Sequence, residues 1–154
     1  MNLKNIMRIL FFYCFAGGLY MTIELFYRQY TTYHMFYLAG IVGTLFLGIN
    51  EWLEYDTDFL LQVFVCGTVA TLAELICGLA FNQNYNIWDY RQLPFNFMGQ
   101  IQLFFAGIWC LFALIFIPVL DCIDYAMFPR KGIEKPYYVI LGKKIELYNI
   151  LKNT

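Results

Sequence analysis

The sequence predicts an all-α fold: a polytopic integral membrane protein built as a compact bundle of four transmembrane helices. Three observations lead to this fold class. Of the 154 residues, 61% are hydrophobic and only 14% are charged, whereas soluble domains are about 45–50% apolar and about 25% charged. Aromatic residues make up 21% of the chain, which is too many for a soluble core to hide behind so few charges. Four segments are apolar over roughly the 20 residues that a bilayer-crossing helix needs.

The first apolar segment, 6–26, is interrupted by Arg8 near its start and by Glu24 near its end. Two positive charges at its start are also typical of a signal peptide. However, the segment lacks an A-x-A cleavage site and is long for a signal sequence, so we expect a retained helix. The second segment, 33–49, is short, but the tyrosines and Trp52 that flank it suit a membrane interface.

The third segment, 59–81, contains a single charged residue, Glu74, and the fourth, 98–120, contains none. Pro118 is expected to kink the fourth helix near its end, because proline removes a backbone hydrogen bond. These four segments justify the predicted bundle.

The polar residues after the fourth segment form a separate region. We therefore divide the chain into a transmembrane domain, 1–128, and a basic amphipathic cytoplasmic tail, 129–154. Within the tail, Gly142 separates two short apolar stretches. Two structures fit this pattern: a segment lying on the membrane surface, and a hairpin that turns at Gly142.

The distribution of Lys and Arg predicts the orientation. Four spans place both termini on one side of the membrane, and that side carries eight basic residues against two on the other. Because cytoplasmic loops carry the excess of Lys and Arg, both termini are predicted to be cytoplasmic in a multi-pass protein of the inner (plasma) membrane. The loop at 53–58, with Glu54, Asp56 and Asp58, then also faces the cytoplasm, and the loop at 82–97 faces outward.

Glu74 is the clearest candidate for a functional residue, because ionisable groups inside a bilayer are costly unless they are paired or hydrated. It shares one helix face with Gly67, Thr71 and Gly78. Small residues allow close helix packing, so this face is expected to lie against protein. Two interpretations stay open: a proton-linked or ligand-binding group, and an interhelical hydrogen bond that stabilises the bundle.

Other polar residues are expected at the same depth on the outer side. Together they would line a shallow outward-facing pocket for ligand binding or proton exchange, formed by Glu24, Glu74, Asp89, Arg91, Asn96 and Gln100. A simpler arrangement also fits. Glu24 would pair with Arg28 one helical turn later, Asp89 would pair with Arg91, and the loop aromatics would form an interfacial belt.

Several classes of function find no support in the sequence. No P-loop, nucleophile-elbow or zinc-protease motif occurs, so we predict no enzyme, no catalytic residue and no cofactor. With His34 as the single histidine and no C-x-x-C pair, the five cysteines do not form a metal site and are expected to be free thiols. A net charge of −1 gives no electrostatic footprint for nucleic acid.

A block of motifs in the second half of the chain resembles a known family. A glutamate with a glycine four positions later is followed in order by W-D-Y, P-x-N and G-x-I. This order is similar to that of the putative ABC-transporter permease family called type IV, a bacterial family, and the resemblance extends over roughly residues 17–125. The matching residues are Glu74, Gly78, Trp88, Asp89, Tyr90, Pro94, Asn96, Gly99 and Ile101.

The resemblance implies a permease or transport-type component of the bacterial inner membrane. Its expected partners are the lipid bilayer, further copies of itself in a homo-oligomer, and a cytoplasmic ATPase or another soluble protein. The family often has a serine after W-D-Y, and Arg91 stands there instead, so no serine-dependent role carries over. Two alternatives stay open: a non-catalytic membrane partner or effector that recruits a cytoplasmic protein, and an oligomeric pore.

Overall fold

The structure, a computed structural model, describes residues 3–54, 56–129 and 135–146. The described residues are mainly helical, as predicted. They form four longer helices and one short helix: α1 (Leu3–Arg28), α2 (Tyr33–Leu47), α3 (Ile49–Trp52), α4 (Phe59–Phe81) and α5 (Leu103–Met127).

Three of these helices are long and apolar enough to cross a membrane: α1 with 26 residues, α4 with 23 and α5 with 25. The helix at the predicted second span, α2, has 15 residues. At 1.5 Å per residue it is about 22 Å long, whereas the hydrocarbon core of a bilayer is about 30 Å thick. The described residues thus contain three helices of spanning length and one shorter apolar helix, which Gly48 separates from α3.

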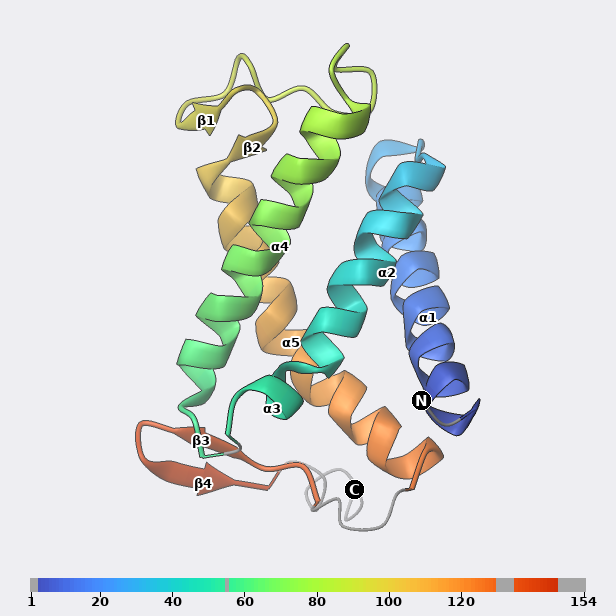
Figure 1. Cartoon of the computed structure of the whole chain (residues 1–154). Helices are drawn as coiled ribbons and strands as arrows, with labels where there is room; N and C mark the ends of the chain where they lie inside the picture. The colour runs from blue at the N-terminus through green and yellow to red at the C-terminus, as the bar shows by residue number, and fades with distance from the viewer. Residues whose placement is uncertain (1–2, 55, 130–134, 147–154) are drawn as a thin grey trace.

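The helices pack as two antiparallel pairs, α1 with α2 and α4 with α5, and α2 also contacts both helices of the second pair. Figure 1 shows α2 between α1 and the α4–α5 pair. Glycines allow the close approach within each pair. A methyl group added at Gly43 would overlap Ala16 of α1, and one added at Gly67 would overlap Cys110 of α5.

The two ends of the bundle differ. At the upper end in Figure 1, the segment between α4 and α5 carries a small antiparallel pair, β1 (Asn96–Phe97) and β2 (Ile101–Gln102). The lower end holds the start of α1, helix α3, and a hairpin of β3 (Tyr138–Ile140) and β4 (Lys143–Ile145).

This hairpin decides between the two structures considered for the tail, as far as residues 135–146 are concerned. Leu141 and Gly142 form its two-residue turn with φ of 49° and 77°. Both values are positive, as the favoured hairpin turns require. The remaining tail residues, 130–134 and 147–154, lie outside the described residues.

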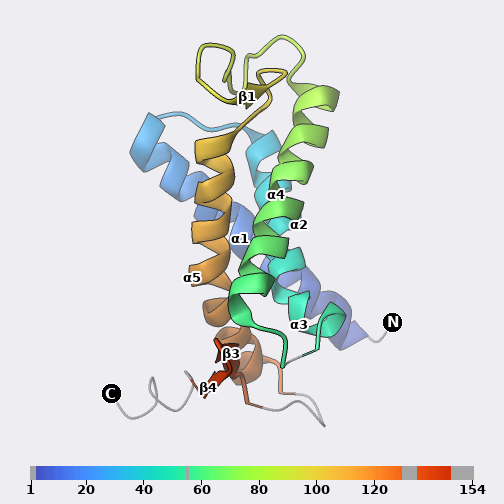
Figure 2. The same cartoon turned by 90° about the vertical axis from the view of Figure 1, so that its left-hand side faces the viewer.

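The core lies where the four longer helices meet, and its fully buried residues include Phe12, Ala70, Ala113 and Ile117. The outer surface of the helices is also strongly apolar and exposes many large side chains. Such a surface suits contact with lipid, because soluble proteins rarely expose so large an apolar surface to water. Pro118 lies inside α5, and the lower part of α5 runs at an angle to the upper part in Figures 1 and 2.

Candidate functional site

Glu74 lies on the face of α4 that packs against α5, and its exposed fraction is 3%. Both carboxylate oxygens accept hydrogen bonds. The Tyr90 hydroxyl donates to Oε1 at 3.1 Å, and Trp109 Nε1–H donates to Oε2 at 3.0 Å. One donor comes from the upper loop and the other from α5. The carboxylate therefore connects three parts of the chain, and the small residues on its helix face make this contact possible.

Aromatic rings surround the two donors. Trp109 stacks on Tyr20 of α1 with ring centroids 5.9 Å apart, and Tyr90 stacks on Phe105 at 4.7 Å. Burial raises the pKa of Tyr90, and the charge of Glu74 raises it further. The Tyr90 hydroxyl therefore stays protonated and acts as a donor to the carboxylate.

Glu24 lies at the same end of the molecule, in the last turn of α1, with an exposed fraction of 7%. Its Oε1 pairs with Arg28 Nη2 at 2.7 Å, which is the local pairing that the sequence offered as the simpler arrangement. Its Oε2 is buried and has no hydrogen-bond partner among the described residues. Tyr20 lies within electrostatic range of both Glu24 and Glu74, so the two carboxylates belong to one region.

Gln100 is buried in the loop above this region. Its side-chain oxygen accepts a hydrogen bond from the Asn82 side chain, and its side-chain N–H donates to the Asn82 backbone carbonyl, each at 3.1 Å. The backbone carbonyl of Gln100 accepts from Trp88 Nε1 at 2.9 Å. Asn82 also donates to the Trp88 carbonyl at 2.7 Å and accepts from the backbone N–H of Ile87 at 2.9 Å. Gln100 thus holds the loop in shape. Asn82 was not among the predicted site residues, although an amide immediately after an apolar helix was a usable signal.

Asp89 and Arg91 lie on the outside of the loop and pair with each other, with Asp89 Oδ2 2.8 Å from Arg91 Nη2. This contact lowers the pKa of Asp89 to about 2. The Arg91 guanidinium also lies over the Tyr85 ring at 4.0 Å. Asn96 stabilises the turns on both sides of it: its side-chain N–H donates to Leu93 O at 2.7 Å, and its Oδ1 accepts from the Gly99 N–H at 3.0 Å. The hydrogen bonds and ion pairs of these three residues among the described residues join them to the loop rather than to Glu74.

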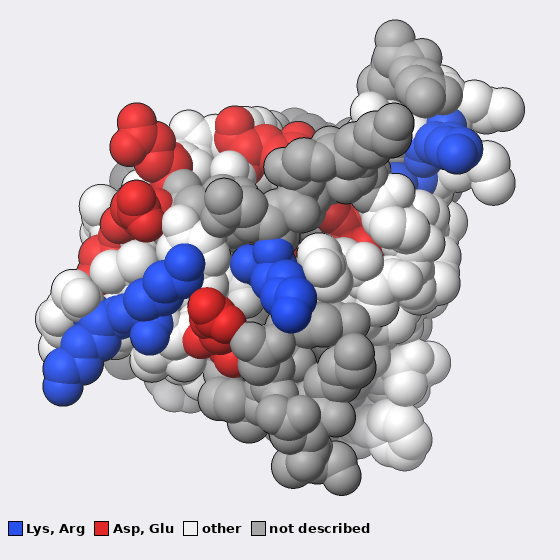
Figure 3. Space-filling view, turned by 90° about the horizontal axis from the view of Figure 1, so that it is seen from below, with Lys and Arg blue, Asp and Glu red and all other residues white. Residues whose placement is uncertain are grey.

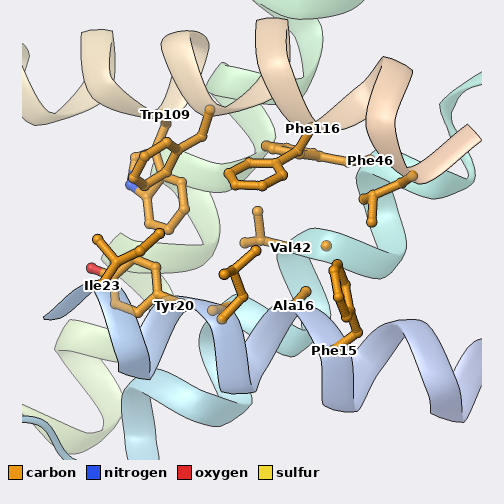
Figure 4. A pocket seen from close by; sticks show the side chains of 13 residues that line it. Phe15, Ala16, Tyr20, Ile23, Val42, Phe46, Trp109 and Phe116 are labelled. Carbon is orange, nitrogen blue, oxygen red and sulfur yellow. The ribbon is translucent and has the colours of Figure 1, made fainter. Parts of the chain in front are cut away.

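A crevice of about 40 Å³ lies beside the Glu74 region, between α1, α2 and α5 (Figure 4). Its lining is apolar, and none of the six residues expected to form a polar pocket belongs to it. Tyr20 and Trp109 are part of its wall, so Glu74 lies behind Trp109 as seen from the crevice. The other lining residues are Phe15, Ala16, Leu19, Ile23, Ala39, Val42, Gly43, Phe46, Phe112, Phe116 and Leu120.

A second polar cluster, at the lower end, was not anticipated. Arg8 is buried in α1, and its Nε donates to Asp124 of α5 at 2.5 Å, while Nη1 pairs with Glu51 at 3.1 Å. One turn away on α5, Asp121 accepts from Asn50 at 2.7 Å and from the Tyr138 hydroxyl at 2.6 Å. The available signal was the presence of opposite charges within apolar segments whose ends meet on one side of the membrane.

The described residues contain no cluster of three or more potential metal-binding side chains, and the five cysteines are free thiols. A family model described as "Putative ABC-transporter type IV" matches residues 8–141, which is most of the chain. Comparisons with curated proteins and with solved structures found no match.

Proposed function

The chain belongs to the Putative ABC-transporter type IV family and is a multi-pass membrane protein of transport type; from this premise we propose that Glu74 is the proton-linked or ligand-binding group of its transport cycle. We also propose that the protein contributes no catalytic site of its own.

The observation that carries this proposal is the environment of the Glu74 carboxylate. It is buried in a helix of spanning length, and it accepts hydrogen bonds from two neutral donors, Tyr90 and Trp109. Among the described residues, no cation forms an ion pair with it. Because an isolated charge is costly at membrane depth, a proton or a cationic ligand would neutralise it.

The other predicted site residues take supporting roles in this proposal. Glu24 offers a second carboxylate, and its Oε2 has no hydrogen-bond partner among the described residues. Gln100 and Asn96 hold the loop that carries Tyr90. Asp89 and Arg91 form the charged outer surface of the same loop.

We further propose that both termini face the cytoplasm of a bacterial inner membrane, that α2 completes a four-span bundle, and that 129–154 forms a cytoplasmic tail. The protein would act as a homo-oligomer or with a cytoplasmic ATPase. The start of α1 and the β3–β4 hairpin lie at one end of the bundle, which supports placing both termini on one side (Figure 1).

Proton flux tests the role of Glu74. The protein is reconstituted in liposomes that contain a pH-sensitive dye, and a potassium diffusion potential drives protons inward. We expect Glu74→Gln to abolish the protein-dependent flux, because an amide cannot carry a proton at this position. Glu51→Gln is the matched control, since its side chain is 54% exposed at the opposite end. Full flux in Glu74→Gln would contradict the proton-linked form of the proposal.

One observation favours the alternative, a membrane partner that recruits a soluble protein. The lower end carries side chains of both charges close together (Figure 3), and Glu51, Glu54 and Asp56 are exposed in the segment before α4. Tagged protein purified in mild detergent would retain a cytoplasmic protein identifiable by mass spectrometry. Under this alternative, Glu54→Gln would weaken the retention, while Glu74→Gln would leave it unchanged. Recovery of a homo-oligomer alone would favour a pore, which depolarisation of expressing cells would reveal.

A further inference from the structure

The β3–β4 hairpin is firmly attached to the lower end of the bundle. The Tyr138 side chain is 1% exposed, its hydroxyl donates to Asp121 Oδ2 at 2.6 Å, and its ring lies 4.8 Å from the Phe59 ring. Val139 also forms a parallel bridge with Asp58. The hairpin therefore has a defined position relative to the membrane-spanning helices.

Asp58 sets the depth of that position. It caps the N-terminus of α4, where its Oδ1 accepts from the Leu60 N–H at 2.9 Å. Its Oδ2 accepts from the backbone N–H of Leu141, in the hairpin turn, at 2.8 Å. Because one carboxylate holds both segments, the turn lies level with the first residues of a helix that can span the membrane. The first residues of a helix that crosses a bilayer are expected where the hydrocarbon core meets the lipid headgroups.

The hairpin turn presents an apolar side chain at this depth. Leu141 is 80% exposed, and the exposed side chains of Leu60 and Leu61 lie at the start of α4 nearby in the structure. In Figure 1 the turn points away from the other helices of the bundle. Leu141 therefore extends the apolar surface of α4 outward at the membrane interface. Partial insertion of an amphipathic segment into this interface is favourable, because it buries apolar area.

Two lysines follow the turn directly. Lys143 and Lys144 are both exposed, and Lys144 Nζ lies 3.6 Å from the centre of the Tyr137 ring. Among the described residues, neither lysine forms an ion pair. Two acidic side chains of the loop before α4 have other partners: Asp56 accepts from the Tyr137 hydroxyl at 3.0 Å, and Asp58 caps α4. Figure 3, which views the lower end of the molecule, shows basic side chains along one edge.

We propose that the hairpin binds the headgroups of anionic phospholipids. In this site Leu141 enters the interface, the lysine stems lie along it, and the two ammonium groups contact lipid phosphates. The site lies at the opposite end of the molecule from Glu74 and does not depend on its proposed role.

The test uses the full chain in a neutral detergent. Native mass spectrometry measures the apparent affinities for phosphatidylglycerol and phosphatidylcholine, and their ratio gives the preference for the anionic lipid. A lysine near an anionic surface contributes roughly a five-fold change in affinity. We therefore expect the preference to fall by about five-fold in Lys143→Gln and further in the double variant Lys143→Gln/Lys144→Gln.

Two controls make the result specific. The charge-conserving double variant Lys143→Arg/Lys144→Arg should keep the wild-type preference. Lys4→Gln removes a positive charge from α1 at the same end and should change the preference by less than two-fold. The proposal is overturned if the double glutamine variant keeps the wild-type preference, or if Lys4→Gln lowers the preference equally. Proton flux in the same variants should be unchanged, which separates this result from the proposed role of Glu74.

Discussion

Replacing Arg8 with methionine tests the lower polar cluster most directly. The Arg8 side chain is 7% exposed and that of its partner Asp124 is 10% exposed, and their contact is 2.5 Å long. Methionine has a similar length but no charge, so the variant leaves the Asp124 carboxylate buried without its cation. Breaking a buried ion pair by removing one partner costs about 3–5 kcal/mol. We expect Arg8→Met to lower the free energy of unfolding by this amount.

Glu51 provides the matched control, because it pairs with the same guanidinium at 3.1 Å while its side chain is 54% exposed. An exposed pair contributes about 0–1 kcal/mol, so Glu51→Gln should have little effect. The free energy of unfolding is measured by circular dichroism in mixed micelles with increasing fractions of dodecyl sulfate.

A double-mutant cycle separates the ion pair from simple loss of packing. In Arg8→Met/Asp124→Leu the Asp124 carboxylate is removed together with its cation, and replacing a buried pair with apolar residues is often close to neutral. Asp121 keeps its hydrogen bonds from Asn50 and Tyr138 in both variants. We expect the double variant to be more stable than Arg8→Met alone, with a coupling energy well above the roughly 0.5 kcal/mol found for independent sites. Additive effects, or a loss below about 1 kcal/mol in Arg8→Met, would show that Arg8 and Asp124 do not form a stabilising buried pair.

Two further predictions concern helix packing and the outer loop. Gly43→Ala should lower the free energy of unfolding by about 1–3 kcal/mol, because its methyl group would overlap Ala16; Gly18→Ala, where nothing lies within 4 Å, should be neutral or slightly stabilising in the same micelle assay. The carboxyl of Asp89 should titrate near pH 2 in carbon-13 NMR, and near its ordinary value in Arg91→Gln. Because the folded-state pKa is lowered, the contribution of this pair to stability is present above about pH 4 and is lost as the pH falls toward 2. A midpoint near the ordinary value in the wild type would show that the pair does not form.

Hydropathy located the long helices well but did not determine where each of them ends. The predicted segment 59–81 coincides with α4, Phe59–Phe81. The predicted start of the fourth segment at residue 98 lies five residues before α5 begins at Leu103, because Gly99 adopts φ of 65° in the turn between β1 and β2. A turn of this kind depends on backbone conformation, which the mean hydropathy of a segment does not indicate.

In the predicted site, contacts within one helix could likewise be predicted, whereas contacts between distant segments could not. Pairing of Glu24 with Arg28 could be predicted, because residues four apart on a helix are neighbours, and the small residues beside Glu74 predicted its protein-facing side. The two donors to Glu74 could not be assigned, since Tyr90 and Trp109 come from a loop and from another helix. For the same reason, the predicted polar pocket did not distinguish residues that support the loop from residues that contact Glu74.

The amino-acid sequence was sufficient to predict the membrane class, the long apolar helices and the protein-facing side of Glu74, because composition, hydropathy and helical periodicity are properties of single segments. The contact of Arg8 with Asp124, 116 positions away, and the contact of Tyr138 in the tail with Asp121 became evident from the folded structure alone. Such partners are chosen by how helices dock. Docking depends on complementary shapes of surfaces far apart in the chain, such as Gly43 against Ala16, and no local pattern encodes it.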